Sequence, residues 1–126
     1  MWPPTTDSGV DLVVYSPVTG HADTVQVKTV FSPAPSGGRG RLAIGWSFPH
    51  DLRAVLLAVV LLSEDEAWLF TADEARAVAQ QHHPTGSRRL YWYTDAEMPQ
   101  RDGVPLKQGD MTGYLPQARA ADSFLR

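Results

Sequence analysis

The sequence predicts a mixed α/β fold, with a β-rich first half followed by alternating strand and helix segments. Three observations lead to this prediction: two alternating segments near the N-terminus, a long apolar run in the middle, and a helix-capping sequence after it. The length of 126 residues predicts one domain over residues 1–126 with a modest core. Apolar content of 43% and charged content of 20% are typical of a folded globular chain.

The two alternating segments predict a β-hairpin. Apolar and polar residues alternate from Val10 to Ser16 and again from Thr24 to Phe31, and residues 17–23 contain the Pro, Gly and Asp of a turn. A two-residue turn at Thr19-Gly20 would then place Asp11 opposite Lys28. This register matters because a slip of one residue moves a side chain to the other face of the sheet.

The remaining strands and helices follow from the same kinds of pattern. Nearly all residues of the central strand are apolar, which is typical of a strand covered on both faces. The expected strands are Arg41 to Phe48, Arg53 to Leu62 (central), Ala67 to Phe70 and Arg89 to Thr94, and a last helix is expected from Pro116 to Phe124.

A capping sequence marks the first helix. Thr71 is the expected N-cap and Glu74 follows three residues later, which is the pattern of a capping box. We expect this helix to run to about Gln81, with Pro84 and Gly86 ending it. In the aromatic strand after it, alternation places Trp92 in the core and Tyr91 and Tyr93 on the other face.

Composition removes several classes of site. The absence of cysteine excludes disulfides, thiolate metal sites and cysteine nucleophiles, and fits a cytoplasmic protein. The N-terminus lacks the pattern of a signal peptide, and the apolar run Ala54 to Leu62 is too short to cross a bilayer, so no membrane is expected. The net charge of −3 argues against tight, nonspecific coating of DNA.

The predicted hairpin contains the residues whose side chains are best suited to binding or catalysis. Asp11 lies in its first strand, and Gln26 and Lys28 lie in its second, with fourteen residues between Asp11 and Gln26. If the strands pair, a carboxylate, an amide and an ammonium converge on one face, where they could hold a divalent cation beside a phosphate. A surface salt bridge between Asp11 and Lys28, worth about 0.2–1 kcal/mol, is the simpler interpretation.

The strings Gly9-Val10-Asp11 and Val25-Gln26-Val27-Lys28-Thr29 resemble the motifs of the PD-(D/E)XK nuclease superfamily, in a branch with glutamine in place of the second acid. The resemblance implies a restriction-endonuclease-like core and a Mg²⁺-dependent DNA nuclease or a degenerate relative. It implies that Asp11 binds the metal, that Gln26 helps to place it, and that Lys28 orients or activates the attacking water.

The family also has a helix before the aspartate strand, and this part of the chain departs from it. Ten residues precede Asp11, and Pro3-Pro4 disfavours a helix among them. We therefore expect the core to lack its first helix, or to take it from a partner chain. An exposed sheet face would favour a homodimer or another oligomer.

Basic residues elsewhere offer weaker candidates. Arg39, Arg41, Arg88 and Arg89 could contact the phosphates of a nucleic acid, although scattered surface arginines are the default interpretation. His82-His83 is expected at a helix end, where the dipole favours imidazolium.

A second functional hypothesis belongs to a different class. The chain would be a non-catalytic protein-interaction domain that assembles as a homodimer through its β-sheet. Mutation of Lys28 distinguishes the two hypotheses, because it should abolish hydrolysis in the first and leave assembly intact in the second.

Overall fold

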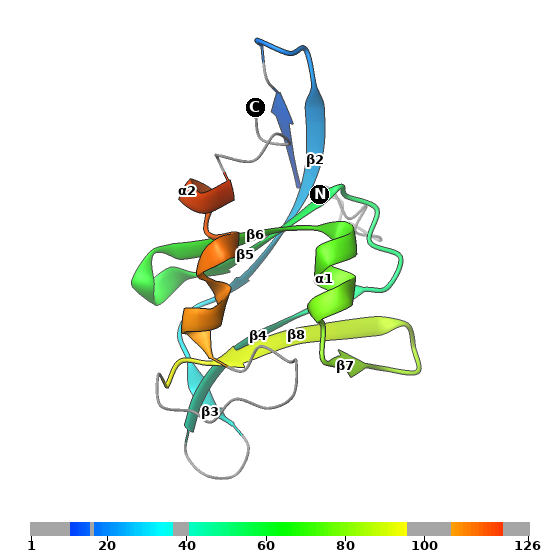
Figure 1. Ribbon diagram of the computed structural model, residues 1–126. Coiled ribbons are helices and arrows are strands. Elements are labelled where there is room, and N and C mark those ends of the chain that lie inside the picture. Colours follow the sequence, from blue (N-terminus) through cyan, green and yellow to red (C-terminus); the bar gives the residue numbers. More distant parts are fainter. Residues whose placement is uncertain (1–10, 16, 37–40, 96–106, 120–126) are drawn as a thin grey trace, which may run out of the picture.

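The computed structural model describes residues 11–15, 17–36, 41–95 and 107–119, and the strands in these ranges form two four-stranded sheets (Figure 1). The first sheet has the order β1-β2-β5-β6, with β1 (Leu12–Tyr15), β2 (Ala22–Val30), β5 (Leu56–Leu61) and β6 (Glu66–Thr71). The second has the order β3-β4-β8-β7, with β3 (Ala34–Ser36), β4 (Arg41–Pro49), β8 (Ser87–Tyr93) and β7 (Gln81–His82). The predicted mixed α/β fold is confirmed.

Strand β5 is the central strand expected from the apolar run. It lies between β2, to which it is parallel, and β6, with which it forms an antiparallel hairpin. Leu57, Val59 and Leu61 are fully buried on one of its faces. The strand is shorter than the expected strand Arg53 to Leu62, because it begins at Leu56 and because Leu62 already begins the 3₁₀ helix η1 (Leu62–Glu64).

Three tryptophans join the two sheets in one core. Trp68 comes from β6, while Trp46 and Trp92 come from β4 and β8. The ring centroid of Trp92 lies 4.9 Å from each of the other two, and all three side chains are almost fully buried. Such tilted and edge-on contacts are the favourable geometry for aromatic rings. The predicted core position of Trp92 is confirmed.

Helix α1 (Ala72–Val78) begins as the capping box predicts. The Thr71 hydroxyl accepts a hydrogen bond from the Glu74 N–H at 3.1 Å, and the Glu74 carboxylate accepts one from the Thr71 N–H at 2.8 Å. These bonds satisfy two of the amides that a helix start leaves unpaired. Together with Ala75, which packs in the core, they fix the helix against the sheets.

The predicted end of this helix at Gln81 is wrong, because α1 ends at Val78. Gln81 and His82 form β7 instead and pair with β8, so His82-His83 lies in a hairpin rather than at a helix end. The Gln80 side chain bonds both the N–H and the carbonyl of Tyr91, at 3.1 and 2.6 Å. Pairing with β8 therefore outweighs local helix propensity here.

The C-terminal part of the described chain covers the same side of the sheets as α1 (Figure 1). It consists of the 3₁₀ helix η2 (Gln108–Tyr114) and α2 (Pro116–Arg119). The last helix begins at Pro116 as predicted, and its predicted extension to Phe124 lies outside the described residues. Buried Arg119 donates a hydrogen bond to Glu74 at 2.6 Å, which ties α2 to α1. Within the described ranges, no helix combines the length and apolar character needed to cross a bilayer.

Candidate functional site

The hairpin β1–β2 forms, but its register differs from the predicted one. Leu12 pairs with Val25 and Tyr15 pairs with Ala22, so the connection is longer than the two-residue turn expected at Thr19-Gly20. Pro17 in this connection cannot donate a ladder hydrogen bond, and Gly20 adopts a φ of 71°, which favours glycine. The predicted position of Asp11 opposite Lys28 is therefore wrong.

Asp11 lies instead beside the segment Val25 to Val27. Its N–H donates to the Val25 carbonyl at 2.8 Å, and its carboxylate Oδ2 accepts the Val27 N–H at 2.7 Å. The carboxylate thus sits next to Gln26 in the middle of β2. Lys28 lies further along the same strand, so the hydrogen bonds between Asp11 and the β2 backbone flank Gln26 rather than Lys28.

Gln26 is the most deeply placed of the three predicted site residues. Its exposed fraction is 2%, and it pairs across the sheet with Leu57 of β5, which is completely buried. Lys28 is registered beside Val59, also completely buried, and is itself half-buried. Because alternate residues of a strand share a face, Gln26 and Lys28 are on the same side of β2.

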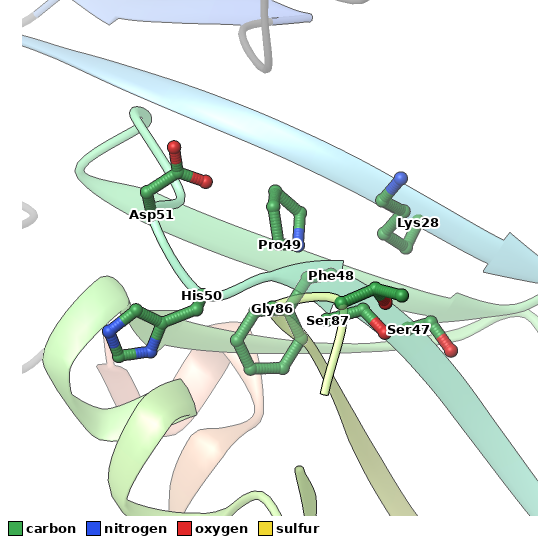
Figure 2. Close-up of a pocket in the computed structure, with 9 residues that line it drawn as sticks. Lys28, Ser47, Phe48, Pro49, His50, Asp51, Gly86 and Ser87 are labelled. Atoms are coloured by element: carbon green, nitrogen blue, oxygen red, sulfur yellow. The ribbon is translucent and has the colours of Figure 1, made fainter. Parts of the chain in front are cut away.

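The Lys28 side chain lines a groove of about 630 Å³, which lies between β2 and the end of β4. Figure 2 shows Lys28 on β2 above Ser47 and Ser87, with His50 and Asp51 toward the opposite end. The groove combines an ammonium, an imidazole, a carboxylate and three hydroxyls around the apolar ring of Pro49. Asp11 is not among the residues that line it.

The donors at the hairpin suit Mg²⁺ in their chemistry. Asp11 offers a carboxylate and Gln26 an amide oxygen, and Mg²⁺ binds such hard oxygens while keeping several waters. Among the described residues, no group of three or more His, Cys, Asp or Glu side chains could hold a metal ion. The Gln26 amide oxygen is buried, whereas the Asp11 side chain is exposed.

The four arginines predicted to contact nucleic acid have different surroundings. Arg39 lies outside the described residues. Arg41 forms an ion pair with Asp95 at 2.6 Å. Arg88 donates from Nε to His50 Nδ1 at 2.8 Å and from one terminal nitrogen to the Arg76 carbonyl at 2.9 Å. Arg89 is exposed, and its Cζ lies 5.9 Å from the ring centroid of Tyr91.

No spacing in the sequence supported a place for the end of β4 in the groove. His50 and Asp51 follow Pro49, and only the return of the chain as the β7–β8 hairpin places them beside Ser87. The His50 N–H donates to the Gly86 carbonyl at 2.6 Å, which fixes this contact. The local signal was the strand-ending Pro49, but nothing in the sequence linked it to residues near 86.

Comparisons with known proteins complete the description of the site. No family model matches the chain, and no curated protein matches its sequence. Among solved structures, the chain is similar to that of a bacterial homing endonuclease, I-Ssp6803I, with 14% sequence identity and a TM-score of 0.46. The similarity covers 79% of this chain and 68% of that one. Membership of the PD-(D/E)XK superfamily stays a prediction from the sequence motifs.

Proposed function

We propose that this protein hydrolyses phosphodiester bonds in DNA with the help of Mg²⁺. The observation that carries the proposal is the arrangement along β2. Asp11 is hydrogen-bonded to the backbone of β2 next to Gln26. Lys28, the next residue on the same face as Gln26, lines the groove. Asp11 and Gln26 would hold the ion, and Lys28 would contact the phosphate. When bound, the ion supplies polarisation of a phosphoryl oxygen and a more acidic water.

The roles of the protein groups follow from their charges. Phosphodiester hydrolysis adds negative charge to the reacting phosphate, and an ammonium placed beforehand beside that phosphate stabilises it. Lys28 is suited to this role because it pairs in the sheet with buried Val59 and lines the groove. The groove of about 630 Å³ has room for a nucleotide unit of the substrate.

Asp11→Asn should lower the affinity for Mg²⁺ at least about tenfold and the cleavage rate at least about 100-fold, because the negative charge on the ligand is lost. Asparagine can still accept the Val27 N–H, so the hairpin contact seen at 2.7 Å is preserved. Calorimetric titration with Mg²⁺ and Mn²⁺, beside cleavage assays on single-stranded and duplex DNA, measures both effects. Asp110→Asn, at an exposed aspartate in η2, is the control. Equal metal uptake and cleavage by wild type and Asp11→Asn would refute the proposal.

A second candidate function is favoured by the exposure of β1. This strand lies at the edge of the described sheet, and its four apolar or aromatic residues are about half or more exposed: Leu12 54%, Val13 62%, Val14 49% and Tyr15 62%. An exposed, apolar edge strand is a template for pairing with another chain. In this candidate, the protein assembles as a homodimer through β1 and has no catalytic role.

Val13→Lys should convert such a dimer into a monomer, because a charge on an edge strand opposes strand pairing. Size-exclusion chromatography with light scattering, over a concentration series, gives the oligomeric state. Val18→Lys, at a residue that is 93% exposed in the hairpin connection, is the matched control and should leave the dimer unchanged. A wild-type protein that is monomeric at its highest soluble concentration would eliminate this candidate.

A further inference from the structure

Three hollows meet around the β7–β8 hairpin. The groove beside Lys28 is the largest, and two smaller hollows of about 170 and 180 Å³ adjoin it. All three are lined by Ser87, and both smaller ones by His82 and His83. Their shared lining residues make the three hollows neighbours, from Lys28 on β2 to the hairpin.

The side chains that line this surface are mostly cationic or hydrogen-bond donors. Among the residues that line the three hollows, Asp51 is acidic, whereas Lys28, Arg88 and Arg89 are basic. Three histidines and the hydroxyls of Ser47, Thr85 and Ser87 add further polar groups. Such a surface, in a chain of net charge −3, concentrates positive charge locally and suits an anionic ligand.

Hydrogen bonds fix the tautomers of two of the histidines. His50 Nδ1 accepts from Arg88 Nε at 2.8 Å, so a neutral His50 carries its proton on Nε2. His83 Nδ1 accepts from the Thr85 backbone N–H at 3.3 Å and lies 2.8 Å from the Thr85 hydroxyl, which assigns the same tautomer. Each imidazole thus has an Nε2–H donor that these contacts do not use.

Arg89 lies over Gly45 of the neighbouring strand β4. A Cβ on Gly45 would come within 2.6 Å of an Arg89 terminal nitrogen and 2.8 Å of its Cζ, so the guanidinium occupies space that glycine leaves open on β4. The Arg89 Cζ also lies 5.9 Å from the ring centroid of Tyr91, which is two residues further along β8. A planar guanidinium positioned in this way is suited to bidentate contact with a phosphate.

We propose that the β7–β8 hairpin binds the phosphate backbone of a polynucleotide, with Arg89 and His83 as the principal contacts and His50 and Ser87 as further donors. The inference rests on the proposed function, which requires a nucleic-acid substrate. It assigns the surface on which that substrate binds beside Lys28. Phosphate is the shared chemistry of a polynucleotide and a free nucleotide. The presence of three neighbouring hollows favours the polymer, since successive phosphates can occupy separate hollows.

Fluorescence anisotropy of labelled single-stranded and duplex oligonucleotides in EDTA tests this surface without any metal. Arg89→Gln and His83→Ala should each raise Kd, with about a tenfold increase expected for Arg89→Gln. Arg89→Gln should also reduce the slope of log K against log salt, by about 0.9 for a duplex or about 0.7 for a single strand. Arg53→Gln, at an exposed arginine outside the three hollows, is the matched control and should bind as wild type.

The outcomes separate this inference from the hydrolysis proposal. Because the binding assay contains EDTA, it measures the hairpin surface without metal, and loss of cleavage in Asp11→Asn does not count against that surface. Unchanged Kd and salt slope in both Arg89→Gln and His83→Ala would overturn the inference, as would absence of binding by wild type. Displacement of the oligonucleotide by an equal concentration of a mononucleotide would show a small-phosphate site and overturn the polymer assignment.

Discussion

Replacing Lys28 by methionine should lower the turnover of DNA cleavage by about 100- to 1,000-fold, which is the effect of removing one preorganised group that stabilises transition-state charge. Methionine retains an unbranched apolar stem, so packing beside Val59 is kept while the ammonium is lost. The measurement is kcat from steady-state cleavage at saturating Mg²⁺, with the melting temperature as a check on folding.

Lys107→Met is the matched control for this substitution. Lys107 is half-buried like Lys28, but it lies at the start of η2 and does not line the groove. Mg²⁺ affinity should be nearly unchanged in Lys28→Met, because the proposed ligands are Asp11 and Gln26. If Lys28→Met and Lys107→Met cleave equally well, Lys28 has no part in the chemistry. If Lys28→Met leaves assembly through β1 intact while cleavage is lost, assembly does not depend on the catalytic residues.

The largest expected effect on stability is at Trp92. Trp92→Ala should lower the free energy of unfolding by about 3–5 kcal/mol, because it opens a cavity at the point where both sheets contribute side chains. Trp46 and Trp68 each lose a ring neighbour 4.9 Å away. Urea denaturation followed by circular dichroism measures the change as a lower midpoint at an unchanged slope.

Tyr93→Ala provides the comparison on the same strand. Tyr93 is half-buried on the opposite face of β8, so its truncation should cost about 1 kcal/mol, as is usual away from a core. Equal losses in the two variants would contradict the assignment of Trp92 to a core shared by both sheets. A much smaller loss for Trp92→Ala than for Tyr93→Ala would mean that the sheets do not depend on this contact.

Local patterns in the sequence predicted much of the fold. The capping box at Thr71 and Glu74 formed as expected because its hydrogen bonds join residues only three apart. Alternation correctly placed Trp92 in the core, because successive side chains of a strand point to opposite faces. Both features depend on backbone geometry within a few residues, which the sequence specifies directly.

Contacts between distant segments decided the remaining features of the candidate site. The sequence motif identified Asp11, Gln26 and Lys28, but the pairing of Leu12 with Val25 placed Asp11 beside Gln26 instead of opposite Lys28. The end of α1 moved to Val78 because β8 offered Gln81 and His82 strand partners.

By itself, the sequence determined the kinds of element and the residues with chemical content, because periodicity, capping and charge are properties of short segments. Only the tertiary structure decided the hairpin register, the groove and the donor surface around His50, His83 and Arg89. The hydrogen bond from Arg88 to His50 spans 38 positions along the chain. Such a contact forms only after β4 and β8 pair, and no local pattern in either strand encodes its partner.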